Sequence, residues 1–206
     1  DAILRMVQRT GAFPALVLPL HALPNTQLSV RLAREGRLFA NGEVVMNTEQ
    51  RTDTATTGLN FVTARPRTEV LADLAHVLEQ LYDPLNHYAR TVFTASQLRA
   101  SHKYRPSIRE LLKLGGAFIR IAASLGTDAS IGPLFWRTLL EVAVTNPGAL
   151  EMTIALAVMH ANYRAQSVSY VEALRRQIEY VNTMGEAAFN AENLRSARSL
   201  PIVAQA

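Results

Sequence analysis

The feature that most constrains this chain is a single strand–turn–helix step between residues 13 and 38. An apolar run at residues 15–20 is typical of a buried β-strand, and a Pro-bearing turn follows at residues 23–26. An amphipathic helix is predicted next, and Gly36 stops it. A parallel strand cannot complete its hydrogen bonds alone, and the chain contains no second step of this kind. We therefore expect this step to be the end of a larger barrel or sheet, so that the chain is part of a longer protein.

The rest of the chain is predicted to be helical after a long polar loop. The loop is rich in Thr, Asn, Asp and Gly, and it leaves room for one short strand at residues 43–46. Turn signals then divide the sequence into about six amphipathic helices. Asp83-Pro84 and Asn146-Pro147 each start a helix, the second ending near Tyr163, and Ser167 starts a separate last helix.

The predicted fold class is therefore mainly α. It is a helical bundle of about six helices, preceded by one strand–turn–helix unit left from an α/β (TIM-like) barrel. The predicted domains are the last barrel unit at residues 1–40, a linker at 41–66, a helical C-terminal domain at 67–193 and a flexible tail at 194–206.

Composition excludes several kinds of site. The chain has 206 residues, of which 49% are hydrophobic, so it can bury a sizeable core. It has no cysteine, which excludes disulfides, thiolate zinc sites and Cys-ligated iron–sulfur clusters within these residues. No apolar run reaches the roughly 18–20 residues that a membrane span requires. The predicted location is cytoplasmic, with peripheral contact to the inner membrane as a further option.

The histidines do not form a metal-binding pattern. His76 has carboxylates three positions away on each side, Asp73 and Glu79, and such spacing is common by chance. No nucleophile elbow and no phosphate-binding glycine loop are present. We therefore predict no catalytic residue and no metal ligand. The histidines, expected to be solvated or to lie in the core, are His21, His76, His87, His102 and His160.

A basic stretch between residues 99 and 120 is the main electrostatic feature of a chain with net charge +4. The simpler interpretation is a solvated helix face and loop. The alternative is a contact with an anionic surface, a membrane more readily than a nucleic acid, since no nucleic-acid-binding motif is present. The candidate residues are Arg99, Lys103, Arg105, Arg109, Lys113 and Arg120.

Three segments together carry a family resemblance. The first, FPALVLPLHALPNTQLSVRLAREGRL, resembles the late strand–turn–helix of radical S-adenosylmethionine (radical SAM) barrels, with Asn25 where that family usually has Gly. Both residues tolerate left-handed backbone angles, so the turn can survive the change. The second, Leu59-Asn60-Phe61-Val62 with the later run LYDPLNHYAR, resembles the region after the barrel in cobalamin-binding radical SAM proteins. The third, PLFWR with Asn146-Pro147 and residues 155–164, resembles their helical C-terminal domain.

This resemblance implies a catalytic apparatus that the chain itself lacks. Such enzymes use a [4Fe-4S] cluster, S-adenosyl-L-methionine and, in this group, cobalamin. Because the chain has no cysteine, it is expected to hold no cofactor, and to be inactive without partner cobalamin and radical SAM domains. Residues that end a barrel strand face the barrel mouth, where barrel enzymes place their sites. The resemblance therefore implies that His21, Asn25 and Thr26 lie near S-adenosylmethionine or substrate.

The leading hypothesis is a C-terminal part of a cobalamin-dependent radical SAM enzyme. Its reaction would be methylation, or a related radical transformation, of a large hydrophobic substrate such as a hopanoid lipid or a tetrapyrrole. The alternative is a helical interaction module that binds an anionic surface through the basic stretch. A third hypothesis is a structural domain that only covers barrel surface, in which case the chain is expected to aggregate or form a homodimer through residues 13–38.

Overall fold

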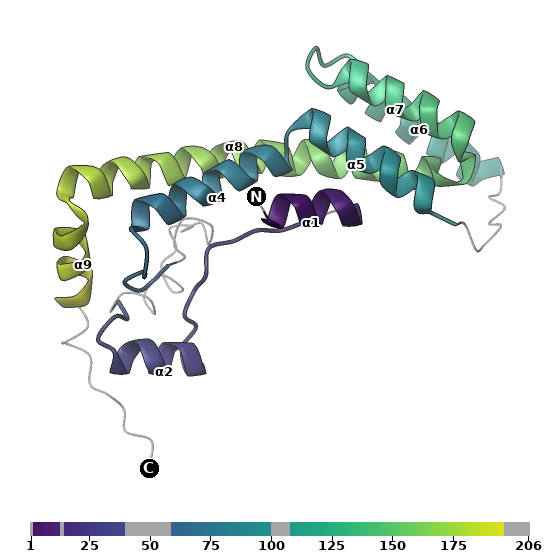
Figure 1. Ribbon diagram of the computed structural model, residues 1–206. Coiled ribbons are helices and arrows are strands. Elements are labelled where there is room, and N and C mark those ends of the chain that lie inside the picture. Colours follow the sequence, from purple (N-terminus) through teal and green to yellow (C-terminus); the bar gives the residue numbers. More distant parts are fainter. Residues whose placement is uncertain (1, 13–14, 40–58, 100–107, 196–206) are drawn as a thin grey trace. The chain divides into compact units, whose positions relative to one another are not determined.

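The computed structural model describes residues 2–12, 15–39, 59–99 and 108–195, and within the last range it does not place the side chains of residues 108–114 and 195. The described residues are mainly helical, which confirms the predicted fold class (Figure 1). The helices are α1 (Ala2–Thr10), α2 (Gln27–Arg34), α4 (Arg67–Leu81), α5 (Pro84–Gln97), α6 (Ile108–Leu125), α7 (Gly132–Thr145), the short 3₁₀ helix η3 (Pro147–Ala149), α8 (Leu150–Met184) and α9 (Glu186–Arg195).

The chain divides into two compact units that each combine distant parts of the sequence. The first unit consists of Asp1–Ala15 and Glu79–Ser167, and the second of Leu16–Leu78 and Val168–Ala206. Helices α4 and α8 contribute residues to both. This grouping follows spatial contacts, so it differs from the sequence-based division near residue 66, which separated barrel-like from helical segments.

The predicted strand at residues 15–20 is wrong. The chain is extended there, but the structure assigns no named strand to any of the described residues, and the backbone of residues 16–19 bonds to no other described backbone segment. A strand needs a neighbour to form its ladder, and the fold provides none here. The alternation survives in the side chains, because Leu16, Leu18 and Leu20 are 67%, 55% and 57% exposed. The strand predicted at residues 43–46 lies outside the described residues.

Helices α1 and α2 end, and α5 begins, at residues whose backbone or side-chain preferences favour a helix terminus. Gly11 and Gly36 end α1 and α2 with φ values of +68° and +66°, in the left-handed region where a Cβ is unfavourable. Asp83 caps α5 by accepting a hydrogen bond from the Asn86 backbone N–H, with Pro84 at the first helical position.

The C-terminal region contains one long helix where two were predicted. Helix α8 continues through Ser167, whose hydroxyl donates a hydrogen bond to the Arg164 carbonyl inside the helix and therefore does not start a new one. The break comes later, at Gly185, with a φ of +84°. Helix α9 then leaves the end of α8 in a different direction (Figure 1).

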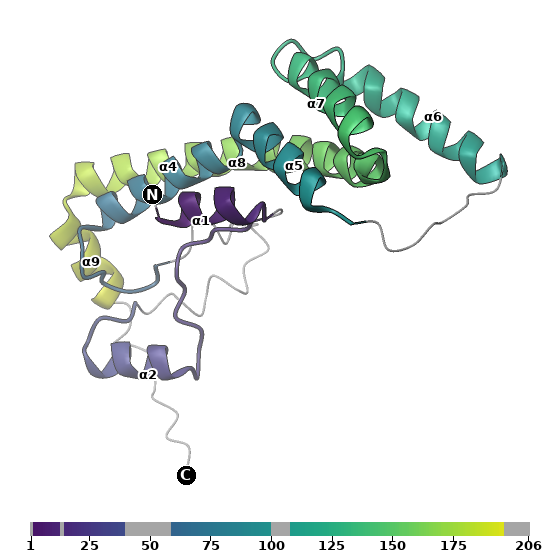
Figure 2. The same ribbon diagram turned by 45° about the vertical axis from the view of Figure 1, so that its right-hand side comes forward.

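The first unit has a hydrophobic core built on α7. Helix α7 packs against α5, and it forms a helical hairpin with α6 (Figure 2). Phe135 lies at the centre of this core, and Trp136 is half exposed beside it. The buried members are Tyr88, Leu125, Ile131, Phe135, Leu139 and Ala157.

Close packing at a glycine occurs in the α6–α7 turn. It does not occur at Gly115 and Gly116, within α6, where no described atom beyond the helix's own nearby backbone lies within 4 Å of a Cβ built at either. At Gly126 such a Cβ would lie 2.7 Å from Trp136 Nε1. The indole N–H donates to the Gly126 carbonyl at 3.2 Å, so the turn needs glycine to seat the ring.

Candidate functional site

The turn before α2 is closed by backbone and side-chain hydrogen bonds. The Thr26 N–H bonds the Leu23 carbonyl at 3.3 Å, with Pro24 and Asn25 at the two central positions. Asn25 has a φ of +61°, the left-handed angle that a type II turn requires at its third residue. The expectation that Asn can replace Gly here is therefore confirmed by the backbone.

Thr26 and Ser29 fix the start of α2 in a capping box. The Thr26 hydroxyl accepts from the Ser29 N–H at 3.2 Å and donates to the Leu23 carbonyl at 2.7 Å. The Ser29 hydroxyl in turn accepts from the Thr26 N–H at 3.1 Å. This exchange satisfies donors that a helix start leaves unpaired. The Thr26 side chain is thus committed to the turn itself.

The other two residues predicted for this site are differently placed. Asn25 is exposed, and its side chain forms no hydrogen bond with a described residue. His21 is partly buried, and its Nε2 is shielded from solvent without a hydrogen-bond partner among the described residues. The Asn25 side chain is therefore accessible to a ligand, whereas His21 Nε2 is buried.

Asn60 holds the backbone that leads into this turn. Its Oδ1 accepts from the Ala22 N–H at 2.8 Å, and its Nδ2 donates to the Ala22 carbonyl at 3.0 Å. Next to it, the Leu59 N–H donates to the Leu20 carbonyl at 2.7 Å. On the other side, Phe61 pairs with Leu38 in an isolated antiparallel bridge. We call these segments, residues 20–22, 37–39 and 59–62, the Asn60 junction.

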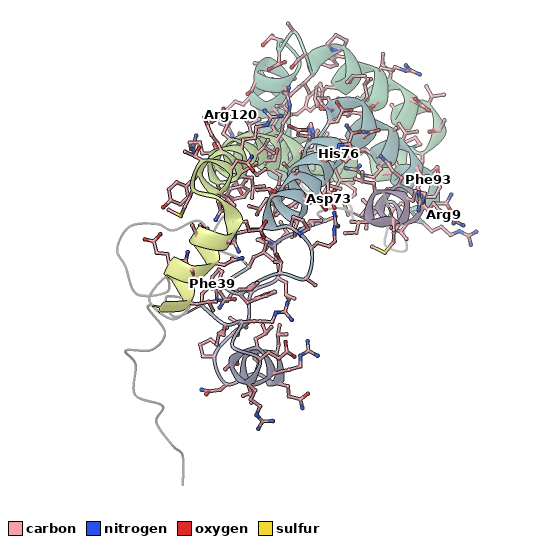
Figure 3. All side chains as sticks on the ribbon, turned by 60° about the vertical axis from the view of Figure 1, so that its left-hand side comes forward. Arg9, Phe39, Asp73, His76, Phe93 and Arg120 are labelled. Carbon is pink, nitrogen blue, oxygen red and sulfur yellow. The ribbon has the colours of Figure 1, made fainter. Side chains whose placement is uncertain are left out.

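Arg67 supports the junction from the first turn of α4. Its side chain is buried, and Nη1 donates to the Leu59 carbonyl at 2.6 Å. The guanidinium carbon lies 5.6 Å from the centre of the Phe39 ring and 5.0 Å from that of Phe189, so two aromatic rings face the cation. Figure 3 shows Phe39 beside α9, which carries Phe189. Burial lowers the pKa of Arg67 to about 10, which leaves it charged at neutral pH.

The cap of α4 comes from a residue far along the chain. The helix begins at Arg67. The Arg67 N–H donates to Glu186 Oε1 at 2.7 Å, across 119 positions of sequence. A carboxylate is favourable at a helix N-terminus. Sequence reasoning could not find Arg67 or Glu186, because nothing near them in the chain signals the contact.

Two buried histidines form the polar centre of the first unit. His87 and His160 stack with ring centres 4.0 Å apart, and His160 Nε2 lies 3.0 Å from the Tyr82 carbonyl, so it carries the proton. Burial lowers the pKa of both, and nearby Arg90 lowers each further. Both rings are therefore neutral at pH 7. Stacked rings do not converge their nitrogens on a point, and the pair is a core feature.

Metal binding finds no support among the described residues, where no group of three or more His, Cys, Asp or Glu side chains is arranged to hold an ion. His76 and Asp73 are exposed on α4 (Figure 3), and Asp73 pairs with Arg65 at 2.9 Å. His102 lies outside the described residues.

The basic stretch is mostly beyond what the structure describes. Arg99 and Arg120 are exposed. Lys103 and Arg105 lie outside the described residues, as do the side chains of Arg109 and Lys113. The anionic-surface contact stays a prediction. Among the described helices, none is long and apolar enough to cross a membrane.

Comparison with known proteins assigns this sequence to a family. A model of a domain of unknown function, DUF4070, matches residues 26–179, from the cap of α2 into α8. The chain belongs to the DUF4070 family. The DUF4070 match starts at Thr26, so the extended segment and His21 precede it, whereas Asn60 and Arg67 lie within it.

One curated relative carries the name of an enzyme class. The DUF4070 chain is 26% identical over 183 residues to a protein named an uncharacterised methyltransferase from the cyanobacterium Synechocystis, a match that covers 86% of this chain. The chain spans only 31% of that relative's length. No solved structure matches.

Proposed function

We propose that this chain is the helical accessory part of a cobalamin-dependent radical SAM methyltransferase. The observation that carries the proposal is the apolar segment at residues 16–19, whose backbone bonds to no other described backbone segment and which leads through residues 20–22 into the capped turn before α2. Its exposed leucines suit a strand whose neighbours lie elsewhere. The similarity to a protein named as a methyltransferase supports the same class of activity. The resemblance of the turn to radical SAM barrels supports the finer assignment.

The residues present do not fit an iron–sulfur cluster, because the chain has no cysteine. We therefore assign the cluster, S-adenosylmethionine reduction and cobalamin to a partner catalytic region, and this chain is inactive by itself. The role of its own residues is to bind and orient S-adenosylmethionine or the substrate. His21 and Asn25 lie at the rim where S-adenosylmethionine or substrate is bound, and Thr26 holds the shape of the turn. The substrate is large and hydrophobic, such as a hopanoid lipid or a tetrapyrrole.

The first experiment tests the activity of the complete protein. The full coding sequence is expressed anaerobically, and we expect iron–sulfur absorbance, cleavage of S-adenosylmethionine and transfer of its methyl group. A complete protein with no cysteine triad to hold a cluster would contradict the proposal.

The second experiment tests the apolar edge. Leu18→Lys places a charge on the exposed face of the extended segment, and we expect it to prevent binding of the chain to the separately expressed catalytic region. Leu140→Lys, at a leucine of α7 that is also exposed, is the matched control and should leave binding intact. Equal loss of binding in both variants, or a dimer of the chain by sedimentation that only Leu18→Lys disrupts, would count against the proposed partner.

A further inference from the structure

Asn60 takes the place of a neighbouring strand. Its carboxamide donates to and accepts from the same residue, Ala22, at 3.0 Å and 2.8 Å. This is the pattern by which two paired residues exchange both backbone hydrogen bonds in an antiparallel ladder. Asn60 and Ala22 are 7% and 2% exposed, so solvent does not replace these bonds. The peptide three residues before the left-handed Asn25 is thus fixed by one side chain.

The position of Asn60 is itself fixed by its neighbours. Its own carbonyl accepts from the Phe39 N–H at 2.9 Å. The preceding residue, Leu59, has a φ of +60°, which is unfavourable for a branched side chain and persists only when surrounding contacts determine it. Those contacts are two hydrogen bonds: the Leu59 N–H donates to the Leu20 carbonyl, and the Leu59 carbonyl accepts from Arg67. The strained backbone therefore aims the Asn60 side chain at Ala22.

The support continues into the helices of the second unit. Arg67 is held by the Phe39 and Phe189 rings, and its backbone N–H by the Glu186 carboxylate. The contacts form one series, from α9 to Arg67, from Arg67 to Leu59, and through Asn60 to Ala22. Each step is a hydrogen bond or a ring contact between buried or half-buried groups.

We propose that Asn60 is a positioning residue for the turn at residues 23–26, and that α4 and α9 set the geometry of this turn through Arg67. The inference rests on the proposed function in one respect, because it takes the turn to be part of the site. It gives the helical domain a defined task. Beyond covering the apolar edge, the domain holds the turn that carries His21 and Asn25 in one conformation.

The test measures amide hydrogen exchange in the 206-residue chain with Asn60→Ala and Asn60→Asp. Aspartate keeps the acceptor for the Ala22 N–H and loses the donor to the Ala22 carbonyl. We expect Asn60→Ala to speed exchange at Ala22 and Thr26 by about tenfold, the effect of losing one buried hydrogen bond. Asn60→Asp should restore protection of Ala22 in part. Amides of α7 in the first unit should keep their protection.

A second variant distinguishes a local effect on the turn from a general loss of folding. Arg67→Lys keeps the charge but not the planar fork of the guanidinium. We expect it to speed exchange at Ala22, although residue 67 makes no hydrogen bond to Ala22. Arg65→Lys, two positions earlier and exposed, is the matched control and leaves exchange unchanged. Unchanged exchange at Ala22 and Thr26 in the Asn60 variants, or an equal loss of protection across α7, would overturn the positioning role.

Kinetics of the complete enzyme separate the inference from the proposed function. If both hold, Asn60→Asp raises KM for S-adenosylmethionine or the substrate more than it lowers kcat, because the turn binds and does not react. Local acceleration of exchange with an unchanged KM and kcat would overturn the role of the turn in the site. It would leave Asn60 established as the residue that holds the turn.

Discussion

The two units differ in the basic side chains that they bury. In the second unit, Arg67 stays charged, because a carbonyl accepts its hydrogen bond and two ring faces meet the cation. In the first unit, the stacked rings of His87 and His160 stay neutral, because burial and the nearby Arg90 guanidinium disfavour the imidazolium. Arg90 itself is buried and charged, and it donates a hydrogen bond to the Leu81 carbonyl at 2.7 Å. A buried base keeps its proton only where the surroundings replace water as its partner. Both arginines have such a partner and keep their charge, whereas the histidines, whose ordinary pKa is much lower, lose their protons on burial.

The largest change in the free energy of unfolding is expected in the hydrophobic core of the first unit. Phe135→Ala removes a ring that is 1% exposed, and we expect a loss of about 3–5 kcal/mol in the free energy of unfolding. Leu140→Ala, on the exposed side of the same helix, should change it by less than about 0.5 kcal/mol. Urea denaturation followed by circular dichroism measures both. Similar losses in the two variants would contradict the core assigned to α7.

A somewhat smaller effect is expected at the charged junction. Arg67→Ala removes a charge-assisted hydrogen bond and two cation–π contacts, and we expect a loss of about 2–4 kcal/mol. Arg65→Ala removes only exposed ion pairs with Glu69 and Asp73, and it should leave the urea midpoint nearly unchanged. A neutral Arg67→Ala would show that the rings and the Leu59 carbonyl are equally stable without the cation.

Acid should weaken the first unit through its histidine pair. Burial lowers the pKa of His160 in the folded chain to about 4, below the ordinary value of about 6.5 in the unfolded chain. The unfolded state therefore binds more protons, and stability is complete above about pH 6.5 and falls toward pH 4, by up to about 1.4 kcal/mol per pH unit for each histidine. Urea midpoints at several pH values measure this slope.

The pair can be separated from the other titrating groups. His87→Phe keeps a ring against His160 and should make the slope between pH 6.5 and 4 shallower. His76→Gln, at an exposed histidine of α4, should leave the slope unchanged. A slope that responds equally to both variants would show that the stacked pair is not its source.

The smallest effects concern glycines, and they have opposite signs. Gly185 ends α8 with a φ of +84°, so Gly185→Ala should destabilise the chain by about 1 kcal/mol. Gly115 lies inside α6 with open space around it, so Gly115→Ala should stabilise by about 0.5–1 kcal/mol. Thermal melts compare the two, and a stabilising Gly185→Ala would contradict the left-handed break.

Local signals predicted the parts of the fold that local chemistry controls. Gly11 and Gly36 end helices, Asp83 caps one, and Asn25 tolerates the left-handed angle of its turn, each through its own backbone preference. Where a signal was ambiguous, tertiary packing decided. Ser167 resembled a helix start, but its hydroxyl also bonds the preceding turn, and α8 continues through it.

The candidate site was predictable only in part. The run at residues 23–26 marked the turn, and Asn60 stood within a segment of the family resemblance without any assigned role. Its bond to Ala22 spans 38 positions, and that between Arg67 and Glu186 spans 119. No periodicity or spacing encodes such pairs, because they depend on where two separate segments meet.

The sequence by itself determined that the chain is mainly helical, that it holds no cysteine chemistry, and that one apolar segment lacks the neighbours a strand needs. These follow from residue type and periodicity, which act over a few positions. Only the tertiary structure decided that the Asn60 side chain stands in for a strand partner and that a buried arginine holds it in place. Burial removes water as an alternative partner, so a polar group's role depends on what the fold places beside it.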